Sequence, residues 1–363
     1  MIKRIANEYV PTDVSAPGET LREILTERSI SQADLSGRMG RPQKTISEIM
    51  NGKAAITPET ALELELVLSI PAEFWIARER DYRTYRARHD QEECFAKDAS
   101  WARRFPTKKM IEYGWIPQHA DRSSLVRNLL EFFGVASSQQ WEQVFSAHQV
   151  EFRKPAAFKP DLHAISAWLR AGISSAEKSK MKPFDRDAYM DALRESRKLI
   201  PSGPEVFAPA LTSIFAEAGV AVAFVPELPK SRASGATMWL SPDRALIQLS
   251  LRYKADDQLW FTFFHEAAHL LLHSKKSIFL EADRNLGGQE ERANEWAANF
   301  LIPPKEYERF ISQGDYTKAD IRAFATRLGL SPGIVVGRLQ HDKKLDHAYC
   351  NDLKRKLVWA NRS

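Results

Sequence analysis

The 363-residue sequence contains only two cysteines, Cys94 and Cys350, which lie far apart and in no spacing typical of a metal site. This scarcity excludes a disulfide framework and a cysteine-based zinc site, so we expect two free thiols. No uninterrupted apolar run approaches the roughly 20 residues that cross a bilayer. The N-terminal residues also lack the apolar core of a signal peptide. We therefore expect a cytoplasmic protein that does not associate with membranes.

Neither sign of charge is strongly in excess. The 52 Lys and Arg residues against 47 Asp and Glu residues give a formal net charge of +5, which is compatible with nucleic-acid binding but does not demonstrate it. The hydrophobic content of 44% is ordinary for a globular protein. A chain of this length can hold two or three domains. Composition therefore excludes general disorder and leaves the function to the motifs.

An HExxH motif lies within an apolar stretch at residues 260–273. On a helix, His265 and His269 lie on one face and can bind one metal ion, while Glu266 points towards the open side of the ion. The surrounding residues are apolar nearly all the way round, which predicts a buried helix, and buried histidines need a partner. The pattern predicts a zinc site with Glu266 as the catalytic base.

A zinc site of this kind needs a third protein ligand and leaves the fourth position to water. His273 lies one turn beyond His269 and about 12 Å from His265 along a helix, which is too far for a shared ion. A bare HExxH motif also occurs by chance, and the alternative is a core helix whose histidines bind neighbouring backbone groups. A glutamate on a following helix favours the zinc interpretation.

That following helix is predicted over residues 287–303, which open with two glycines and end at a proline pair. Glu290, near its start, is the predicted third zinc ligand, and Glu291 is the alternative. Asn294 follows Glu290 by one helical turn and is expected to orient a ligand, since such outer contacts fix ligand geometry. Tyr253, Arg338 and His341 are considered as groups that stabilise the oxyanion.

The stretch from about residue 214 to 340 resembles the ImmA/IrrE family of bacterial metallopeptidase domains. The family's two helical motifs read here as Asp257-Gln-Leu-Trp-Phe-Thr-Phe-Phe-His-Glu-Ala-Ala-His and Glu290-Glu-Arg-Ala-Asn-Glu-Trp-Ala-Ala-Asn-Phe-Leu-Ile-Pro. Trp296 replaces the usual phenylalanine, a change that affects packing more than chemistry. The resemblance implies a zinc endopeptidase in which the two histidines and Glu290 bind the ion and the HExxH glutamate is the general base.

The N-terminal part carries short helical patterns with tight joints. Serine and threonine caps, prolines in first turns and terminal glycines mark their boundaries. Two helices joined by a glycine-bearing turn within such a bundle form a helix-turn-helix. The alternative is a small helical bundle that binds protein. The four patterns cover residues 19–28, 31–40, 41–52 and 57–68.

The second helix of this motif is expected to turn Ile46, Ile49 and Met50 towards the core and polar side chains outwards. Glutamine can bond bidentately to adenine, lysine can bond to guanine or phosphate, and hydroxyl groups can bond to phosphate oxygens. Such a motif reads half-sites about one helical turn apart, so we expect a homodimer on an inverted-repeat operator in double-stranded DNA. The predicted DNA contacts are Gln32, Gln43, Lys44, Thr45 and Ser47.

Residues 12–90 resemble the Cro-like helix-turn-helix family and, within it, the HigA-type antitoxins. The resemblance rests on an ordered run of segments, and it implies a transcription regulator that is nucleoid-associated when bound to DNA. The segments are Pro17-Gly-Glu-Thr-Leu, Ile30-Ser-Gln-Ala-Asp-Leu-Ser, Lys44-Thr-Ile-Ser-Glu-Ile-Met-Asn-Gly-Lys, Ile56-Thr-Pro-Glu-Thr-Ala and Phe74-Trp.

Strands are expected only late in the chain. Residues 220–226 and 245–250 are predicted to form a small antiparallel sheet in front of the peptidase helix, and an edge of such a sheet can hold an extended substrate by backbone pairing. Before them, residues 74–93 form a long arginine-rich helical pattern, which we interpret as a solvated linker, with contact to DNA phosphates as the alternative.

The overall prediction is a mainly α protein with a small β-sheet (α+β). It consists of a helix-turn-helix domain over residues 12–75, a helical linker over 76–95, an all-α connecting domain over 96–205 and a zincin-like peptidase domain over 206–345.

Three functions remain open for this arrangement. The first is a DNA-binding regulator with a working zinc endopeptidase that cleaves a repressor, a toxin or its own chain. The second is an antitoxin-like regulator whose peptidase-like domain is a non-catalytic sensor or partner-binding module. The third is a peptidase that uses its helix-turn-helix only for docking.

Overall fold

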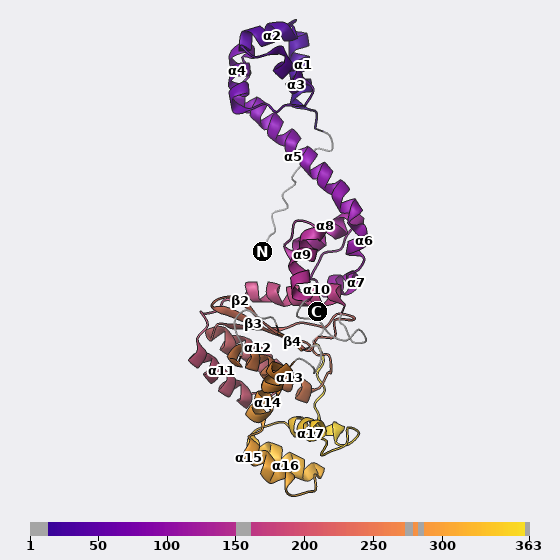
Figure 1. The fold of residues 1–363 in the computed structure, drawn as a ribbon, viewed down its shortest axis with the longest axis vertical. Coiled ribbons are helices and arrows are strands. Elements are labelled where there is room, and N and C mark those ends of the chain that lie inside the picture. Colours follow the sequence, from indigo (N-terminus) through magenta and orange to yellow (C-terminus); the bar gives the residue numbers. More distant parts are fainter. Residues whose placement is uncertain (1–13, 150–160, 273–278, 282–286, 360–363) are drawn as a thin grey trace. The chain divides into compact units, whose positions relative to one another are not determined.

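The computed structural model describes residues 14–149, 161–272, 279–281 and 287–359. It is mainly helical with one small sheet, which confirms the predicted α+β class (Figure 1). The chain divides into two compact units, Met1–Asp98 and Ala99–Ser363. Among the described residues, no helix combines the length and apolarity needed to cross a membrane. Both cysteines are free, as expected.

The first unit is a bundle of helices around one apolar core. Leu35, Ile46 and Trp75 are fully buried at its centre. A methyl group at Gly18 would clash with the backbone carbonyl of Ile49, so glycine permits the close contact of the first and third helices. The helices are α1 Pro17–Glu27, α2 Gln32–Met39, α3 Gln43–Met50, α4 Pro58–Leu68 and α5 Ala72–Lys97.

The helix boundaries in this unit follow from capping. Ser31 accepts a hydrogen bond from the backbone N–H of Asp34 and starts α2, and Thr57 does the same with Thr60 at the start of α4. α2 ends at Gly40, whose φ of 65° lies in the left-handed region that favours glycine. The chain then turns over Arg41 and Pro42 into α3, which gives the expected helix-turn-helix.

The second unit begins with helices that precede the sheet. Trp101, Phe105 and Trp141 form a buried aromatic cluster among the first of them, with ring centroids 4.9–5.8 Å apart. The separation of residues 96–205 from residues 206–345 as two domains stays a prediction. These helices are α6 Ala99–Ala102, α7 Thr107–Glu112, α8 Arg122–Phe133, α9 Ser138–Gln149, α10 Leu162–Glu177, α11 Arg186–Lys198 and α12 Pro204–Glu217.

The sheet has four strands in the order β1-β3-β2-β4. β1 pairs in parallel with β3, whereas β2 is antiparallel to both β3 and β4. The prediction of an antiparallel pair was therefore wrong. Residues 234–240, which we expected only to separate two strands, form most of an additional strand, β2. Because β2 and β3 form a hairpin, β3 runs beside β1 in the same direction as β1. The strands are β1 Val220–Phe224, β2 Gly235–Ser241, β3 Arg244–Leu249 and β4 Phe279–Glu281.

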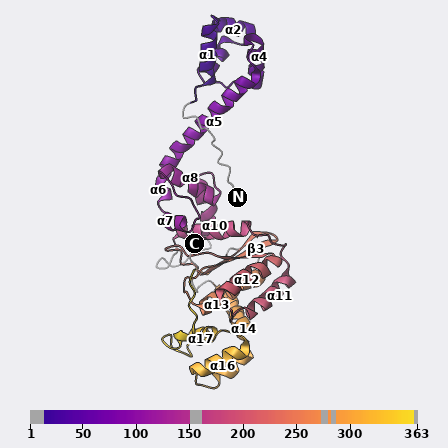
Figure 2. The same cartoon turned by 180° about the vertical axis from the view of Figure 1, so that it is seen from behind.

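Helices cover both faces of this sheet (Figures 1 and 2). On one face, the side chain of Gln248 donates to the carbonyl of Trp168 in α10 at 2.7 Å. On the other face, Ile247 and Leu249 join a core with Phe263 of α13, the helix Asp256–Leu272. Successive residues of a strand point to opposite faces, so both sets in β3 are buried. The HExxH motif is therefore enclosed between the sheet and the following helices.

The C-terminal elements pack around α13. Asp256 lies in the first turn of α13. Its backbone N–H donates to the carbonyl of Arg355, and its Oδ1 accepts from the backbone N–H of Arg355, both at 3.0 Å. Asp257 forms a 2.8 Å ion pair with Lys354. These contacts hold the last described residues on the start of the motif helix. The elements are α14 Gly287–Leu301, α15 Pro304–Ile311, α16 Lys318–Leu328, α17 Pro332–His341 and the 3-10 turn Asn351–Leu353.

Candidate metal centre

The motif helix α13 is buried almost all the way round, as its apolar sequence predicts. His265 and His269 are 1% and 2% exposed, and their Nε2 atoms lie 3.0 Å apart. Imidazole rings are seldom buried this deeply without a charged or metal partner. One turn of helix thus places two nitrogen donors at one point inside the unit.

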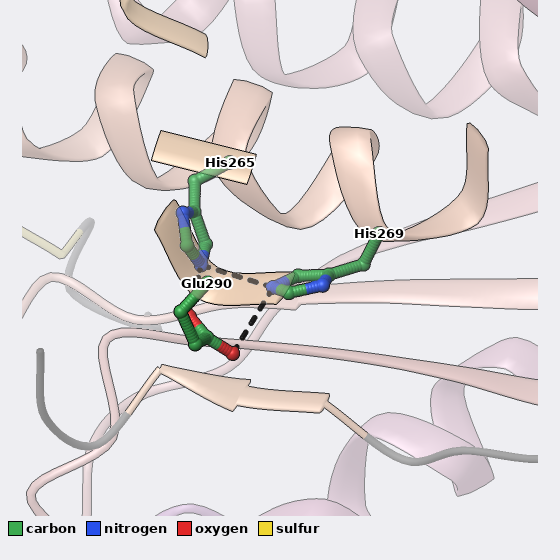
Figure 3. A group of neighbouring side chains, drawn as sticks. All are labelled: His265, His269 and Glu290. Atoms are coloured by element: carbon green, nitrogen blue, oxygen red, sulfur yellow. Dashed lines mark hydrogen bonds and ion pairs between the residues drawn. The ribbon is translucent and has the colours of Figure 1, made fainter. Parts of the chain in front are cut away.

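Glu290 reaches this point from the first turns of α14. Its carboxylate oxygens lie 3.1 Å from Nε2 of His265 and 3.5 Å from Nε2 of His269. Figure 3 shows the two rings and the carboxylate turned towards one another. Among the described residues, these three form the group whose donor atoms could hold a metal ion.

The spacing of the donors fits a tetrahedral metal ion. Zinc binds histidine nitrogen and carboxylate oxygen at about 2.0–2.2 Å, so ligands at tetrahedral positions lie about 3.3 Å from one another. The three separations of 3.0, 3.1 and 3.5 Å bracket this value. Two imidazoles and one carboxylate are also a donor set that suits zinc. The residues present therefore fit the group that the sequence predicts.

Glu266 lies beside this cluster and is fully buried. A methyl group at Gly235 of β2 would lie 2.7 Å from both Cγ and Oε1 of Glu266, so the side chain rests against a strand position that only glycine leaves open. Thr237, two residues along the same strand, donates from Oγ1 to the carbonyl of Glu266 at 2.9 Å. The strand β2 thus fixes both the side chain and the backbone of this residue.

A second support comes from Tyr189 in α11. Its hydroxyl donates to the carbonyl of Ala267 at 3.0 Å. Burial raises the pKa of Tyr189 well above its usual range, and the negative charge of Glu266 adds to the rise. The tyrosine therefore stays protonated as a donor. Sequence reasoning missed both Tyr189 and Thr237, because no local pattern marks a contact between such distant segments.

The remaining predicted residues around the centre lie in different settings. Glu291 is exposed, and Asn294 is partly buried one turn beyond Glu290. The role of Asn294 in orienting a ligand stays a prediction. His273, which the sequence excludes as a ligand, lies outside the described residues. The structure thus brings the predicted Glu290, and not the alternative Glu291, to the two histidines.

The three residues considered for the oxyanion are not brought to the histidines. Tyr253 is 54% exposed in the loop before α13. Arg338 and His341 both contact Asp342, at 2.7 and 2.9 Å. Arg338 and His341 lie on α17, which packs against Asp256 and Asp257 in the first turn of α13. This first turn precedes His265 by about two helical turns.

Helix α3 carries four of the five predicted DNA contacts, and the fifth, Gln32, begins α2. Ile46 and Ile49 are buried as predicted, and Met50 is partly buried against the same core. The Lys44 side chain is 85% exposed, with the carboxylate of Glu48 at 3.9 Å. A weak, solvated pair of this kind leaves the ammonium group available to a phosphate.

The other predicted contacts are less exposed than Lys44. Gln43 is exposed, whereas Thr45 and Ser47 are partly buried. Asn51 donates to the carbonyl and the hydroxyl of Ser47 at 2.8 and 3.3 Å. Gln32 packs against α3, with its amide 3.4 Å from the sulfur of Met50. Their contact with DNA stays a prediction.

Fold and site together define a chain with a helix-turn-helix bundle in one unit and a buried His-His-Glu cluster on an HExxH helix in the other. Residues 21–75 match the helix-turn-helix family model, and residues 222–340 match the model described as the IrrE N-terminal-like domain. The chain therefore combines these two kinds of domain, which confirms the predicted resemblances to the helix-turn-helix and ImmA/IrrE families, whereas the HigA type stays a prediction.

Part of the chain is similar to a known regulator. YddM of Escherichia coli, an uncharacterised HTH-type transcriptional regulator, is 33% identical over 60 residues, which cover 16% of this chain and 64% of that protein.

Two solved structures are also similar to part of the chain. A candidate antidote protein of a plasmid maintenance system from Nostoc punctiforme is 24% identical, with a TM-score of 0.23, and the match covers 24% of this chain and 94% of that one. A HigA-family addiction module antidote protein from Coxiella burnetii is 27% identical, with a TM-score of 0.21, over 23% of this chain and 92% of that one.

Proposed function

We propose that this chain is a cytoplasmic transcription regulator of the HigA-like antitoxin type whose second unit is a zinc-dependent endopeptidase. The observation that carries the proposal is the convergence of His265, His269 and Glu290 beside Glu266. Four residues with the chemistry of a peptidase centre meet inside one unit. The substrate is a regulatory protein, namely a repressor, a toxin or the chain itself.

The proposed chemistry assigns each residue one task. A bound zinc ion would supply Lewis acidity, which lowers the pKa of a water molecule to about 7 and polarises a peptide carbonyl. Glu266 accepts a proton on its carboxylate from the attacking water and then donates it to the nitrogen of the leaving amine. Thr237 and Tyr189 hold the backbone carbonyls of this helical turn. The carboxylate therefore stays in place during the proton transfers.

The first unit supplies DNA binding in this proposal. Helix α3 enters the major groove of an inverted-repeat operator, and a homodimer contacts its two half-sites. Leu62 and Leu66, one turn apart on α4, are 56% and 84% exposed. Exposed leucines that are neighbours on a helix favour a protein contact, so α4 is the proposed dimer surface.

One observation favours the alternative of a non-catalytic sensor. Glu266 is 0% exposed, and a general base must lie within hydrogen-bond reach of water and substrate. A regulator that binds metal without turnover would keep the cluster and leave Glu266 enclosed.

The substitution Glu266→Gln separates the two functions, because it keeps the shape and the metal ligands while it removes the base. Wild type and variant, with equal zinc content, are incubated with operator DNA and with candidate repressors or toxins. We expect fragments and derepression of a reporter promoter with the wild type only. Identical fragments and identical promoter output from both proteins would establish the sensor instead.

A further inference from the structure

A shallow pocket lies between the first turns of α13, the loop before this helix and the start of β2. Gln258, Thr262 and Glu266 recur every four residues, so they follow one face of the helix, and the first two line the pocket. Ser234 lines it from the sheet side, directly before Gly235. Thr262 precedes Glu266 by one helical turn, and a methyl group at Gly235 would contact both side chains, so the pocket lies about one turn from the proposed base.

Positive side chains form the wall that faces away from the helix. Arg252 and Lys254 line the pocket together with Tyr253, and the guanidinium of Arg252 lies 5.1 Å from the centre of the Tyr253 ring. Arg252 also donates to the carbonyl of Arg232. Neither Arg252 nor Lys254 has a carboxylate within ion-pair distance among the described residues.

The C-terminal segment adds a third cation. Ala255, another lining residue, pairs with Lys356 in an antiparallel bridge. The flanking hydrogen bonds run from Leu357 N–H to Lys254 O at 2.9 Å and from Asp256 N–H to Arg355 O at 3.0 Å. Bridge partners in this position bring their side chains to the same side of the ladder. Lys356 is exposed and lies opposite a residue that lines the pocket, although it does not line the pocket itself.

The excess of positive charge is confined to the residues at the pocket, because the neighbouring Lys354 and Arg355 lie beside acidic side chains. Lys354 is paired with Asp257, and Arg355 lies 4.0 Å from the carboxylate of Asp256. Those two cations are balanced by acids of α13. Arg252 and Lys254 line the pocket without such balance, and Lys356 lies opposite the lining residue Ala255. A local excess of positive charge of this kind favours an anionic ligand.

We propose that this pocket is an acid-selective substrate subsite, in which Arg252, Lys254 and Lys356 bind the carboxylate of an Asp or Glu side chain close to the scissile bond. The proposal rests on the proposed endopeptidase function and specifies its substrate class. The substrate is a protein with an acidic residue at one fixed position from the cleaved bond.

Binding tests the subsite separately from cleavage. The probes are fluorescein-labelled peptides of one Gly-Ser-Ala sequence in which Glu, Gln or Lys occupies each position in turn, and the protein is the full-length, zinc-loaded Glu266→Gln variant. At one position we expect Glu to bind about fivefold more tightly than Gln, as an effect of roughly 1 kcal/mol gives. Higher salt should reduce this ratio.

Charge reversal provides the matched comparison. The double substitution Arg252→Glu and Lys254→Glu should abolish the preference for Glu and create one for Lys at the same position. Lys305→Glu, on the exposed surface of α15 and outside the pocket lining, should leave the preference for Glu unchanged.

The outcomes distinguish the subsite from the enzyme. Acid preference in binding without cleavage of the same peptides by the wild type would support the pocket and reject the peptidase. Cleavage by the wild type with no preference for an acid at any position would retain the peptidase and overturn the subsite. Equal binding of the Glu, Gln and Lys peptides would also overturn it.

Discussion

The adjacent residues Glu290 and Glu291 have different surroundings. The carboxylate of Glu290 lies within 3.5 Å of both imidazole nitrogens, whereas Glu291 is exposed. Neighbouring residues on a helix are turned by about 100° from one another, so only one of the two can face the histidines. Glu290 therefore supplies the carboxylate of this centre.

Replacement of Glu290 by Gln should therefore remove zinc, because a neutral amide binds the ion more weakly than a carboxylate. We expect about one zinc per chain in the wild type and in Glu291→Gln, and little or none in Glu290→Gln after dialysis. Elemental analysis of the three purified proteins measures this. Full zinc content in Glu290→Gln would place the third ligand elsewhere, and no zinc in the wild type after reconstitution would reject the metal centre.

Gly235 offers a second prediction at this scale. A methyl group there would lie 2.6 Å from Cγ2 of Thr262 and 2.7 Å from Cγ of Glu266, so Gly235→Ala must displace these side chains. Misplacement of a catalytic group by about 1 Å can lower the rate about 100-fold. We expect a loss of kcat of that order in a peptide cleavage assay, with zinc content unchanged.

The matched control for this substitution is Gly288→Ala, because a methyl group at that position has open space around it. Gly288→Ala should leave kcat unchanged and should not destabilise the protein, since alanine is favoured over glycine within a helix. If Gly235→Ala lost zinc or unfolded in a thermal melt, the glycine would be a packing residue and not a determinant of the Glu266 position.

At the element scale, the helices of both sites were predictable because their signals are local. The cap at Ser31, the left-handed Gly40 and the buried Ile46 and Ile49 can each be inferred from the residues next to them. The HExxH helix was equally predictable, since its apolar residues surround two histidines that are one helical turn apart.

Strand pairing was not predictable in the same way. Residues 234–240 were expected only to separate two strands. Whether β1 and β3 run in the same direction depends on the strand β2 that these residues form. Thr237 and Tyr189 were missed for the same reason, because their hydrogen bonds to α13 join segments far apart in the sequence. Long-range pairing of this kind carries no periodic signal.

Helix α3 makes a prediction about sequence reading. Lys44→Ala should weaken binding to all duplex sequences by a similar factor, since a phosphate contact carries no base information, whereas Gln43→Ala should relax preference at one base position by about 1–3 kcal/mol. Sequence selection followed by footprinting measures both effects. Lys97→Ala, exposed at the end of α5, is the control for lost charge. The lack of any enriched sequence for the wild type would favour the docking role of this unit.

Among the described residues, the helix-turn-helix bundle and the elements around α13 have separate apolar cores that share no residue. One is formed by α1 to α5 around Leu35 and Trp75, and the other extends from α11 to the C-terminal segment around α13. The metal ligands belong only to the second unit, and the proposed DNA contacts belong only to the first. A ligand that binds one folded unit stabilises that unit against its own unfolding.

Calorimetry should therefore show two unfolding transitions that respond to different ligands, since separate domains need not unfold together. Zinc at about 1,000 times its dissociation constant stabilises the unit that binds it by about 4 kcal/mol, which raises its Tm by roughly 10 °C. We expect this shift in one transition only, and its loss in Glu290→Gln. Operator DNA should raise the other transition. A single transition that moves with both ligands would show instead that the two units unfold as one and that zinc and DNA binding are energetically linked.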